Sequence, residues 1–370
     1  MKLSCNQDNL SKGLNIVGKI IGNRGNLPVL NNILLSTDKG RLKLSSTDLE
    51  IGINTWIGAK IEQDGAITVP AKLLIEFVQN NTDEKINIET KGNTLNIKSK
   101  KYKANIKGIN ASEFPLIPGI DKNILTEFDA KYFQEAINKT IFAAAFDETR
   151  PILAGVFMSL SDDFLKVVAT DSYRLAEATL KNSQANKKKI KIIVPSRTMS
   201  EISRIVAIVN PNKLKIYLSD NQISFSFADT QIVSRLIEGN YPDYQQIIPK
   251  TSTTKVKISV KEFANALKMA SFFARESANN IKLAITKDKK AQISAISPQV
   301  GDSVSEIMVE SFEGENIEIA FNSKFVLDTI SAVNEQYIFI EANGNSKPAV
   351  IKPFKEKQYL YIIMPLRVED

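Results

Sequence analysis

The stretch that decides the fold is ten residues long and occurs three times, as VPAKLLIEFV at 69–78, VPSRTMSEIS at 194–203 and FNSKFVLDTI at 321–330. Each copy carries Pro or Asn at its second position, where a helix would begin. A basic residue follows two positions later, and apolar residues then recur at helical spacing. The three stretches therefore predict three equivalent helices.

Other landmarks repeat with nearly the same spacing. Thr47-Asp48 returns as Thr170-Asp171, and Glu113-Phe114-Pro115 returns as Asn240-Tyr241-Pro242. A period of about 125 residues is too long for a solenoid unit. We therefore expect three consecutive copies of one domain, with the boundaries 1–120, 127–250 and 255–370.

Each copy shows the same order of signals. An amphipathic helix comes first, as in the spacing of Leu10, Leu14 and Val17. Alternating strand patterns such as 40–45 follow, then the helix of the repeated stretch, then further strands such as 85–89. The pattern predicts an α+β fold in which two helices pack on an antiparallel sheet in every copy.

Composition narrows the function. The chain has no histidine and a single cysteine, Cys5. This disfavours general acid/base catalysis by histidine and excludes an internal disulfide or a thiolate-rich metal site, so we expect no metal and no cofactor. Because no apolar run is long enough for a bilayer span or a signal peptide, we expect a cytoplasmic protein with no membrane partner. The net charge of +7 suits a polyanionic partner.

The positive charge falls at repeated helical positions. The first helices carry one pair of lysines each, two turns apart, and the second helices, which begin in the repeated stretches, add further basic residues: Lys12, Lys19, Lys131, Lys139, Lys261, Lys268, Lys72, Arg197, Arg204 and Lys324. Lysine is common on any exposed helix, but repetition at equivalent positions favours a basic face of one design. Such a face, without interleaved aromatic residues, predicts phosphate contact with duplex nucleic acid that is independent of base sequence.

Several motifs have competing interpretations. We interpret 22–26, the acidic pairs 147–148 and 162–163, and Lys187–Lys189 as turns or solvated loops. Because Thr47-Asp48 repeats Thr170-Asp171, we expect a turn whose carboxylate accepts backbone N–H bonds. Two alternatives remain: an enzyme acting on nucleic acid with a metal at Asp48, Asp171 or Asp147-Glu148, and a monomeric peptide-binding scaffold without DNA.

Four motifs together resemble a known family. They are 169–176 (ATDSYRLA), 239–244 (GNYPDY), 193–195 (IVP) and the ending 361–367 (YIIMPLR). Their order and three-copy spacing are similar to the bacterial sliding clamp, the beta subunit of DNA polymerase III. The resemblance implies a non-enzymatic head-to-tail homodimer whose six domains form a ring around duplex DNA, with helices lining the hole. The ring would tether the polymerase catalytic subunit, and would also bind the clamp loader and other replication or repair proteins.

The resemblance also implies site residues. A pocket for short peptide motifs would lie between the second and third copies and involve Leu153, Thr170, Ser172, Tyr173, Arg174, Leu175, Pro242, Ile247, Asn322, Phe325, Ile362, Met364, Pro365, Leu366 and Arg367. DNA contacts would come from Lys12, Arg24, Lys72, Arg150, Arg197 and Lys268.

For the ring contact, the resemblance implies that Phe272 and Phe273 pack against Ala104 and Ile106 of the other chain. In the same contact, lysines of one chain would face acids such as Glu306 and Glu310 of the other: Lys98, Lys100, Lys101 and Lys103. The chain departs from the family at Gln246, at Tyr173 and in its last residues, 368–370, so the rim of the pocket would read a somewhat altered peptide.

Overall fold

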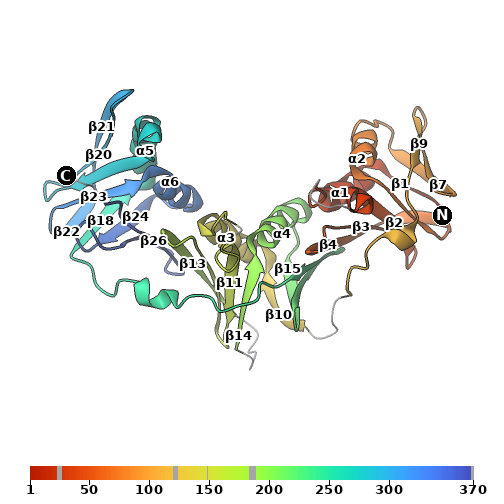
Figure 1. Cartoon of the computed structure of the whole chain (residues 1–370), viewed down its shortest axis with the longest axis horizontal. Helices are drawn as coiled ribbons and strands as arrows, with labels where there is room; N and C mark the ends of the chain where they lie inside the picture. The colour runs from red at the N-terminus through yellow and green to blue at the C-terminus, as the bar shows by residue number, and fades with distance from the viewer. Residues whose placement is uncertain (23–26, 120–123, 148, 183–188, 368–370) are drawn as a thin grey trace. The chain divides into compact units, whose positions relative to one another are not determined.

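The computed structural model describes residues 1–22, 27–119, 124–147, 149–182 and 189–367, and its elements follow the order expected of three copies (Figure 1). The α-helices of the described ranges are α1 (Gln7–Gly18), α2 (Ala71–Gln79), α3 (Ala130–Thr140), α4 (Ser196–Val209), α5 (Val260–Ala274) and α6 (Ser323–Ala332). The helices predicted from the repeated stretch are confirmed, since α2, α4 and α6 each start directly after Pro70, Pro195 or Asn322.

The first helix of each copy begins at a side-chain cap. Asn6, Asp129 and Ser259 stand directly before α1, α3 and α5. Each side chain accepts a hydrogen bond from a backbone N–H two or three residues further on, at 3.2, 3.0 and 3.4 Å. These bonds satisfy N–H groups that have no partner inside the helix, so short polar side chains fix where the helices start.

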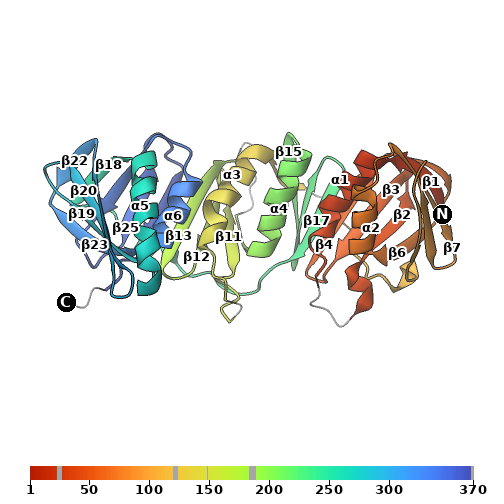
Figure 2. The ribbon, with the colours of Figure 1, turned by 90° about the horizontal axis from the view of Figure 1, so that it is seen from above.

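Burial explains which helical face points inward. In α1 the side chains of Leu10, Leu14 and Val17 are almost fully buried, as are Phe263 and Leu267 in α5. This apolar stripe at helical spacing packs each helix on its sheet. Figure 2 shows α1 beside α2, and α5 beside α6, on the strands of their own copies. The amphipathic pattern therefore leaves the polar side of each of these helices facing away from the sheet of its own copy.

In the part of the chain that the structure describes, the strands form four antiparallel sheets. The first has the order β5 (Ala59–Gln63), β1 (Lys2–Asn6), β7 (Lys85–Lys91), β8 (Thr94–Lys98) and β9 (Lys103–Lys107). The second has the order β10 (Ile124–Asp129), β15 (Lys213–Ser219), β16 (Gln222–Phe227), β17 (Thr230–Arg235), β4 (Ile51–Ile57), β3 (Arg41–Thr47), β2 (Asn32–Asp38) and β6 (Ala66–Pro70).

The other two sheets carry the rest of the chain. The third has the order β14 (Ile190–Pro195), β11 (Gly155–Leu160), β12 (Phe164–Thr170), β13 (Arg174–Lys181), β26 (Tyr359–Ile363), β25 (Ala349–Pro353), β24 (Tyr337–Ala342), β18 (Thr254–Ser259) and β22 (Ser311–Gly314). The fourth has the order β21 (Gly301–Met308), β20 (Lys290–Ser297), β19 (Asn280–Ile285) and β23 (Ile317–Asn322). Short 3-10 helices are η1 (Pro28–Asn31), η2 (Ala111–Glu113), η3 (Ile141–Ala143), η4 (Tyr244–Ile247) and η5 (Arg275–Ser277).

Two of these sheets run from one copy into the next. At the first junction β17 pairs with β4, with Ile232 opposite Ile53. At the second junction β13 pairs with β26, with Leu175 opposite Ile362. The apolar final strand is thus a central strand with buried residues on both faces. Backbone hydrogen bonds therefore join consecutive copies at both junctions.

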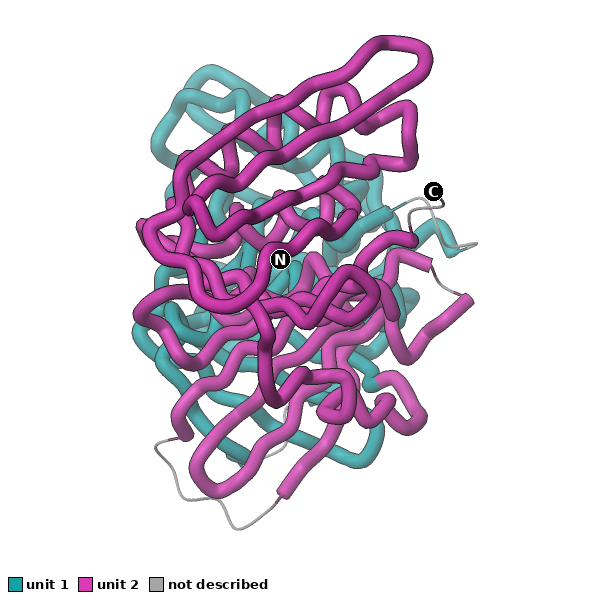
Figure 3. Tube along the Cα trace, turned by 90° about the vertical axis from the view of Figure 1, so that its left-hand side faces the viewer, with its two compact units in different colours: residues 1–134, 197–236 teal, residues 135–196, 237–370 magenta. Residues whose placement is uncertain are grey.

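The chain folds into two compact units, and their boundaries differ from those of the three repeated copies. One compact unit comprises Met1–Gln134 with Arg197–Leu236, and the other comprises Glu135–Ser196 with Ile237–Asp370 (Figure 3). The middle copy contributes strands to both, because its two groups of strands pair with different neighbours. In the ranges that the structure describes, no helix is long and apolar enough to cross a membrane.

Candidate functional site

The Thr-Asp turn of the first copy is held by its own side chains. Thr47 Oγ1 donates to the carbonyl of Ile51 (2.9 Å) and accepts from the N–H of Leu49 (3.0 Å). Asp48 Oδ1 accepts from the N–H groups of Glu50 (3.1 Å) and Ile51 (2.8 Å). Leu49 has a φ of 77°, a backbone conformation that residues with a side chain rarely adopt. The carboxylate therefore stabilises an uncommon turn.

The turn of the second copy repeats this arrangement bond for bond. Thr170 Oγ1 donates to the carbonyl of Arg174 (2.6 Å) and accepts from the N–H of Ser172 (3.2 Å). Asp171 Oδ1 accepts from the N–H groups of Tyr173 (2.9 Å) and Arg174 (3.0 Å), and Ser172 has a φ of 81°. The expectation that this aspartate accepts backbone bonds in a turn is confirmed.

Arg174 lies at the centre of the second junction and is only 8% exposed. Its Nε donates to Asp171 Oδ2 (3.0 Å), its Nη1 to Asp328 Oδ2 (2.5 Å) and its Nη2 to the carbonyl of Phe142 (2.5 Å). The guanidinium also lies over the ring of Phe325, 4.4 Å from its centroid. Burial by itself lowers the pKa of Arg174, but the Asp328 bond and the other negative groups outweigh it and the pKa is raised.

The first junction uses arginines of α4 in a related way. Arg197 Nη1 forms an ion pair with Asp48 Oδ2 (2.5 Å), and its Nη2 donates to the carbonyl of Ile20 (3.0 Å). Arg204 donates from both Nη atoms to two carbonyls near the end of α1 (3.0 and 2.8 Å). Positive side chains at the C-terminal end of a helix satisfy its unpaired carbonyls and complement its dipole. These two arginines therefore fasten α4 to α1.

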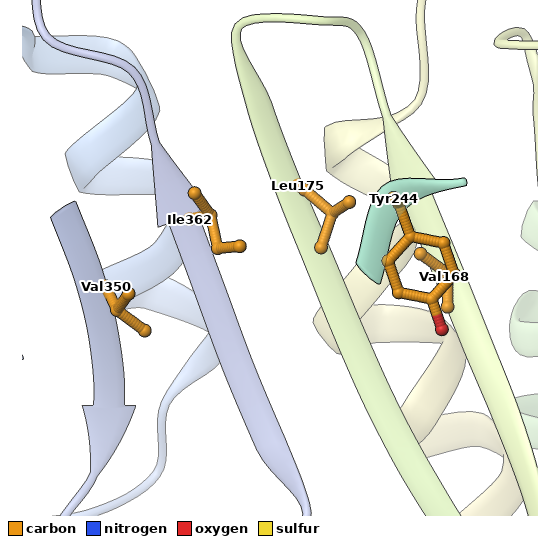
Figure 4. Close-up of a cluster of buried hydrophobic side chains, with 5 residues drawn as sticks. All are labelled: Val168, Leu175, Tyr244, Val350 and Ile362. Carbon is orange, nitrogen blue, oxygen red and sulfur yellow. The ribbon is translucent and has the colours of Figure 1, made fainter. Parts of the chain in front are cut away.

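A buried apolar cluster lies beside the second turn, on the face of the sheet covered by η4. It consists of Val168, Leu175, Tyr244, Val350 and Ile362, which come from four neighbouring strands and from η4 (Figure 4). Leu175 and Ile362 are at most 1% exposed. The cluster joins strands of the second and third copies with the segment that links them, so it fixes the floor of any pocket at this junction.

The hydroxyl of Tyr244 is satisfied within this region. It donates to Glu177 Oε2 (2.6 Å), and Glu177 Oε1 accepts from Lys166 Nζ (2.9 Å). Burial, followed by the bond to Glu177, raises the pKa of Tyr244 well above its ordinary value. Tyr244 therefore anchors the segment between the second and third copies in two ways: its ring packs in the cluster and its hydroxyl bonds Glu177.

Three apolar side chains that follow or precede cluster residues along the chain are open to solvent. Tyr173 is 60% exposed, Ile247 45% and Met364 38%. Tyr173 and Met364 lie side by side, because the N–H of Met364 donates to the carbonyl of Tyr173 (2.9 Å), and Ile247 ends the 3-10 helix that carries Tyr244. Exposed apolar side chains on backbone that is held by hydrogen bonds are typical of a surface that accepts an apolar anchor residue.

The remaining residues of the predicted pocket belong to the same compact unit as this surface. The N–H of Leu153 donates to the carbonyl of Arg150 (3.0 Å), and Arg150 Nη1 in turn donates to the carbonyl of Asp171 (3.4 Å). Leu366 donates its N–H to the carbonyl of Ala320 (2.8 Å), on the strand before α6. The other members follow directly along these segments: Pro242 before η4, Asn322 and Phe325 at the start of α6, and Pro365 and Arg367 in the tail.

The helical lysines are less uniform than their repetition predicts. Lys12, Lys72 and Lys268 are exposed and form no ion pair with another described residue. Lys139 instead bonds both carboxylate oxygens of Glu356 (2.8 and 2.6 Å), with a side chain only 15% exposed. The prediction of an equally basic face on every helix is therefore wrong at Lys139, because a carboxylate from a distant segment neutralises the ammonium.

Arg204 is a second correction to the predicted basic face. Its guanidinium donates to carbonyls near the end of α1 and to Glu201 (2.8 Å). Each of its three nitrogens therefore already has an acceptor within the chain. Arg197 is 45% exposed but shares the same kind of anchoring, and Arg150 lies beside the second turn rather than on a helix. Arg24 lies outside the described residues, as do Glu148, Lys187, Lys188 and 368–370.

An acidic cleft adjoins Arg174 on the helical side. It has a volume of about 590 Å³ and lies between the C-terminal part of α3 and α6. Its lining includes Glu135, Asp328, Glu335 and Glu356, with Lys139 and Phe142. This part of the helical surface therefore presents more negative than positive charge.

The residues predicted for the ring contact lie on or near two open sheet edges. Strand β9, which carries Ala104, and strand β21 each end a sheet. Phe272 is 56% exposed and Phe273 is half-buried, as is Ala104. Ile106 is only 2% exposed in the single chain, because its side chain belongs to the core of its own copy. The contact of Ile106 with a second chain stays a prediction, and any such contact would involve little of its side chain beyond what is already buried.

The carboxylates considered for metal binding serve other purposes. Asp48 and Asp171 hold their turns, and Asp147 accepts from Thr149 N–H (2.9 Å) and Oγ1 (2.6 Å). These bonds lower the pKa of Asp147. Among the residues that the structure describes, no group of three or more His, Cys, Asp or Glu side chains could hold a metal ion.

Comparison with known proteins covers the whole chain. Three family descriptions match in order: DNA polymerase III beta subunit, N-terminal domain at 1–118, central domain at 127–243 and C-terminal domain at 245–367. A beta sliding clamp of Synechococcus elongatus is 33% identical, with all of both chains covered. One of Bacillus subtilis is 30% identical over 99% of this chain and all of the relative.

Solved structures agree with the family descriptions. The crystal structure of the DNA polymerase sliding clamp from Bacillus subtilis has a TM-score of 0.94 at 29% identity, with both chains fully covered. The DNA polymerase III beta subunit from Thermotoga maritima gives 0.93 at 29% identity, again with full coverage.

Three consecutive α+β copies, joined by shared sheets and carrying an apolar surface at the second junction, define a three-domain DNA clamp. The chain belongs to the DNA polymerase III beta subunit family, the beta sliding clamps. It is a processivity factor and not a catalytic subunit, and membership in the family implies duplex DNA, a DNA polymerase and a second copy of the chain as partners.

Proposed function

We propose that this clamp binds the polymerase catalytic subunit, the clamp loader and other replication or repair proteins through short extended peptides. The observation that carries the proposal is the exposure of Tyr173, Ile247 and Met364, which lie two or three residues along the chain from the buried cluster members Leu175, Tyr244 and Ile362. An apolar anchor such as Leu or Phe would insert between the three exposed side chains and the floor, and the polar groups of the turn would bind the backbone of the peptide.

The tail that follows Met364 would form the second wall of this pocket. Its backbone is already fixed at Met364 and Leu366, so a peptide would meet a surface that needs little reorganisation. A small, partly solvated site of this kind suits an exchangeable contact with a dissociation constant of about 1 μM, which corresponds to about −8 kcal/mol. Successive partners could then replace one another on the same clamp.

The test measures binding of a fluorescent peptide with a Leu-Phe anchor to the full chain by anisotropy. Replacing Met364 by Ala should weaken binding about tenfold, because the substitution removes apolar area equivalent to about 1.4 kcal/mol. Leu116→Ala is the matched control, because Leu116 is 92% exposed and lies outside the pocket. Equal affinities for the unaltered chain and Met364→Ala would refute the assignment of the pocket.

For ring closure we propose that β9 of one chain pairs with β21 of the second. Each is an open edge, and head-to-tail closure needs two such contacts. Phe272, Phe273 and Ala104 would supply apolar contact. The β8–β9 hairpin carries lysines, whereas β21 and the residues after it carry acids: Lys98, Lys100, Lys101 and Lys103 against Glu306 and Glu310. Sedimentation of the full chain at micromolar concentration tests this proposal, since a monomer would contradict it.

For DNA we propose diffuse phosphate contact by Lys12, Lys72 and Lys268, with a weaker contribution from the partly anchored Arg197. Arg150 is the least suited member of the predicted set because it lies beside the peptide turn. A topological tether predicts that a clamp loaded on nicked circular DNA is retained until the DNA is linearised. Equal retention on linear DNA would count against sliding.

A further inference from the structure

We propose that Arg174 is a positioning residue for the docked peptide, which holds the turn Thr170–Arg174 in place rather than recognising the peptide with its charge. The inference rests on the proposed peptide pocket and assigns a role within it. The observation behind it is that the guanidinium of Arg174 is enclosed by the chain itself, next to a surface where a free arginine would be expected to contact a ligand.

All three nitrogens of this guanidinium already donate to groups of the chain. Their acceptors are Asp171 Oδ2, Asp328 Oδ2 and the carbonyl of Phe142. The rings of Phe325 and Phe142 lie 4.4 and 5.6 Å from the guanidinium carbon. To bind a peptide carboxylate, Arg174 would have to abandon a buried acid, and a buried charge without its partner is strongly unfavourable.

The bonds of Arg174 join three segments that are far apart in sequence. They are the turn that contains Asp171, the 3-10 helix η3 that contains Phe142, and helix α6 that contains Asp328. The backbone of Arg174 in turn pairs with Ile363 on β26. The side chain of Arg174 therefore ties the turn to η3 and α6, and its backbone ties the turn to β26.

Tyr173 depends on this arrangement most directly. It lies in the turn between Asp171 and Arg174, its N–H donates to Asp171 Oδ1, and its carbonyl accepts the N–H of Met364. If Arg174 released Asp171 and Asp328, the turn would no longer be linked to α6 by a side chain, and only backbone bonds would hold Tyr173 beside Met364. A peptide would then have to order the turn as it bound.

The first junction provides an internal comparison. There the equivalent Asp48 holds the same turn and pairs with Arg197, which bonds the carbonyl of Ile20 near the end of α1. The aspartate, the arginine and a carbonyl that follows the first helix recur, but the arginine comes from α4 and the turn carries Leu49 and Glu50 instead of Ser172 and Tyr173. Both junctions thus link a turn aspartate through an arginine to a carbonyl that follows the first helix. At the second junction this link lies in the turn that carries Tyr173.

The experiment measures affinity for two fluorescent peptides that share a Leu-Phe anchor, one neutral and one with an added Asp. Arg174→Met and Asp328→Asn should each weaken both peptides by the same factor, about tenfold. The double variant should be no weaker than Arg174→Met, because the two residues act through one another. Asp48→Asn, which removes the acid partner of Arg197 at the first junction, should leave both affinities within about twofold.

A loss confined to the acidic peptide would overturn the inference, because it would mean that Arg174 contacts the ligand. Unchanged affinity in Asp328→Asn would also overturn it, and this variant keeps the size of a side chain that is 30% exposed, so it should fold even if Arg174→Met does not. Hydrogen exchange should show faster amide exchange at Tyr173 in both variants. If the unaltered chain bound neither peptide, the proposed function would fail and the positioning role with it.

Discussion

Lys139 and Lys268 occupy comparable first helices, yet they should contribute differently to DNA binding. The perturbations are Lys268→Ala, and the double change Lys139→Met with Glu356→Gln, which removes an ion pair at constant net charge. The ammonium of Lys268 has no partner among the described residues, whereas that of Lys139 is neutralised by Glu356 at 2.6 and 2.8 Å. Only Lys268 is available for a phosphate.

The magnitude follows from counterion release. Removal of one phosphate contact should reduce the slope of log affinity against log salt by about 0.9. We expect this reduction for Lys268→Ala for each protomer that contacts the duplex. Removing Lys12, Lys72 and Lys268 together should reduce the slope by about 2.7 on the same basis. The Lys139 and Glu356 double variant should leave the slope unchanged, because that pair adds no net charge.

The assay is fluorescence anisotropy with a labelled duplex over a severalfold range of sodium chloride. Peptide affinity and sedimentation serve as controls, since neither the pocket nor the ring contact includes these residues. A fall in slope of about 0.9 in the double variant would refute the reasoning, because it would mean that Lys139 leaves Glu356 to contact DNA. An unchanged slope in Lys268→Ala would show that α5 does not face the phosphates.

Three further outcomes are expected. Phe272→Glu should shift the sedimenting species from dimer to monomer without a loss of thermal stability, because Phe272 is 56% exposed in the single chain; an unshifted dimer would contradict the ring contact. Gly314→Ala should destabilise the third copy by about 1–3 kcal/mol in a thermal shift assay, because Gly314 has a φ of 103° and a Cβ there would collide with the carbonyl of Thr253. Burial raises the pKa of the Cys5 thiol to about 12, so a thiol reagent at about pH 8 should label it only after unfolding, and rapid labelling of the native chain would disprove its burial.

The sequence predicts local features of the fold well. The repeated stretch places α2, α4 and α6, because helix starts depend on residues within one turn. The Thr-Asp turns are predictable for the same reason, since every bond of Asp171 Oδ1 ends within three residues. The double burial of β26 follows from its apolar residues on both faces.

Features that depend on distant partners could not be predicted. In sequence Lys139 cannot be told from Lys268, because its partner Glu356 lies 217 positions away. Arg204 likewise has the sequence context of an exposed basic residue, although in the structure it bonds carbonyls at the end of α1. The partners of Arg174 include Asp328, 154 positions away, and no local pattern indicates that pairing. The burial of Ile106 is a different case, because alternation along β9 is enough to place it on the inward face.

The continuous sheet at the first junction has a consequence for the way the three copies fold. Strand β4 satisfies one side of its backbone with β3 and the other with β17, where Thr55 meets Thr230, 175 positions later in the chain. A fragment that held only the first copy would leave that side of β4 as an unpaired edge, and such edges recruit other strands and aggregate. The copies of this clamp therefore depend on one another to fold. During synthesis the first copy can pair the free side of β4 only after β17 of the middle copy has been made.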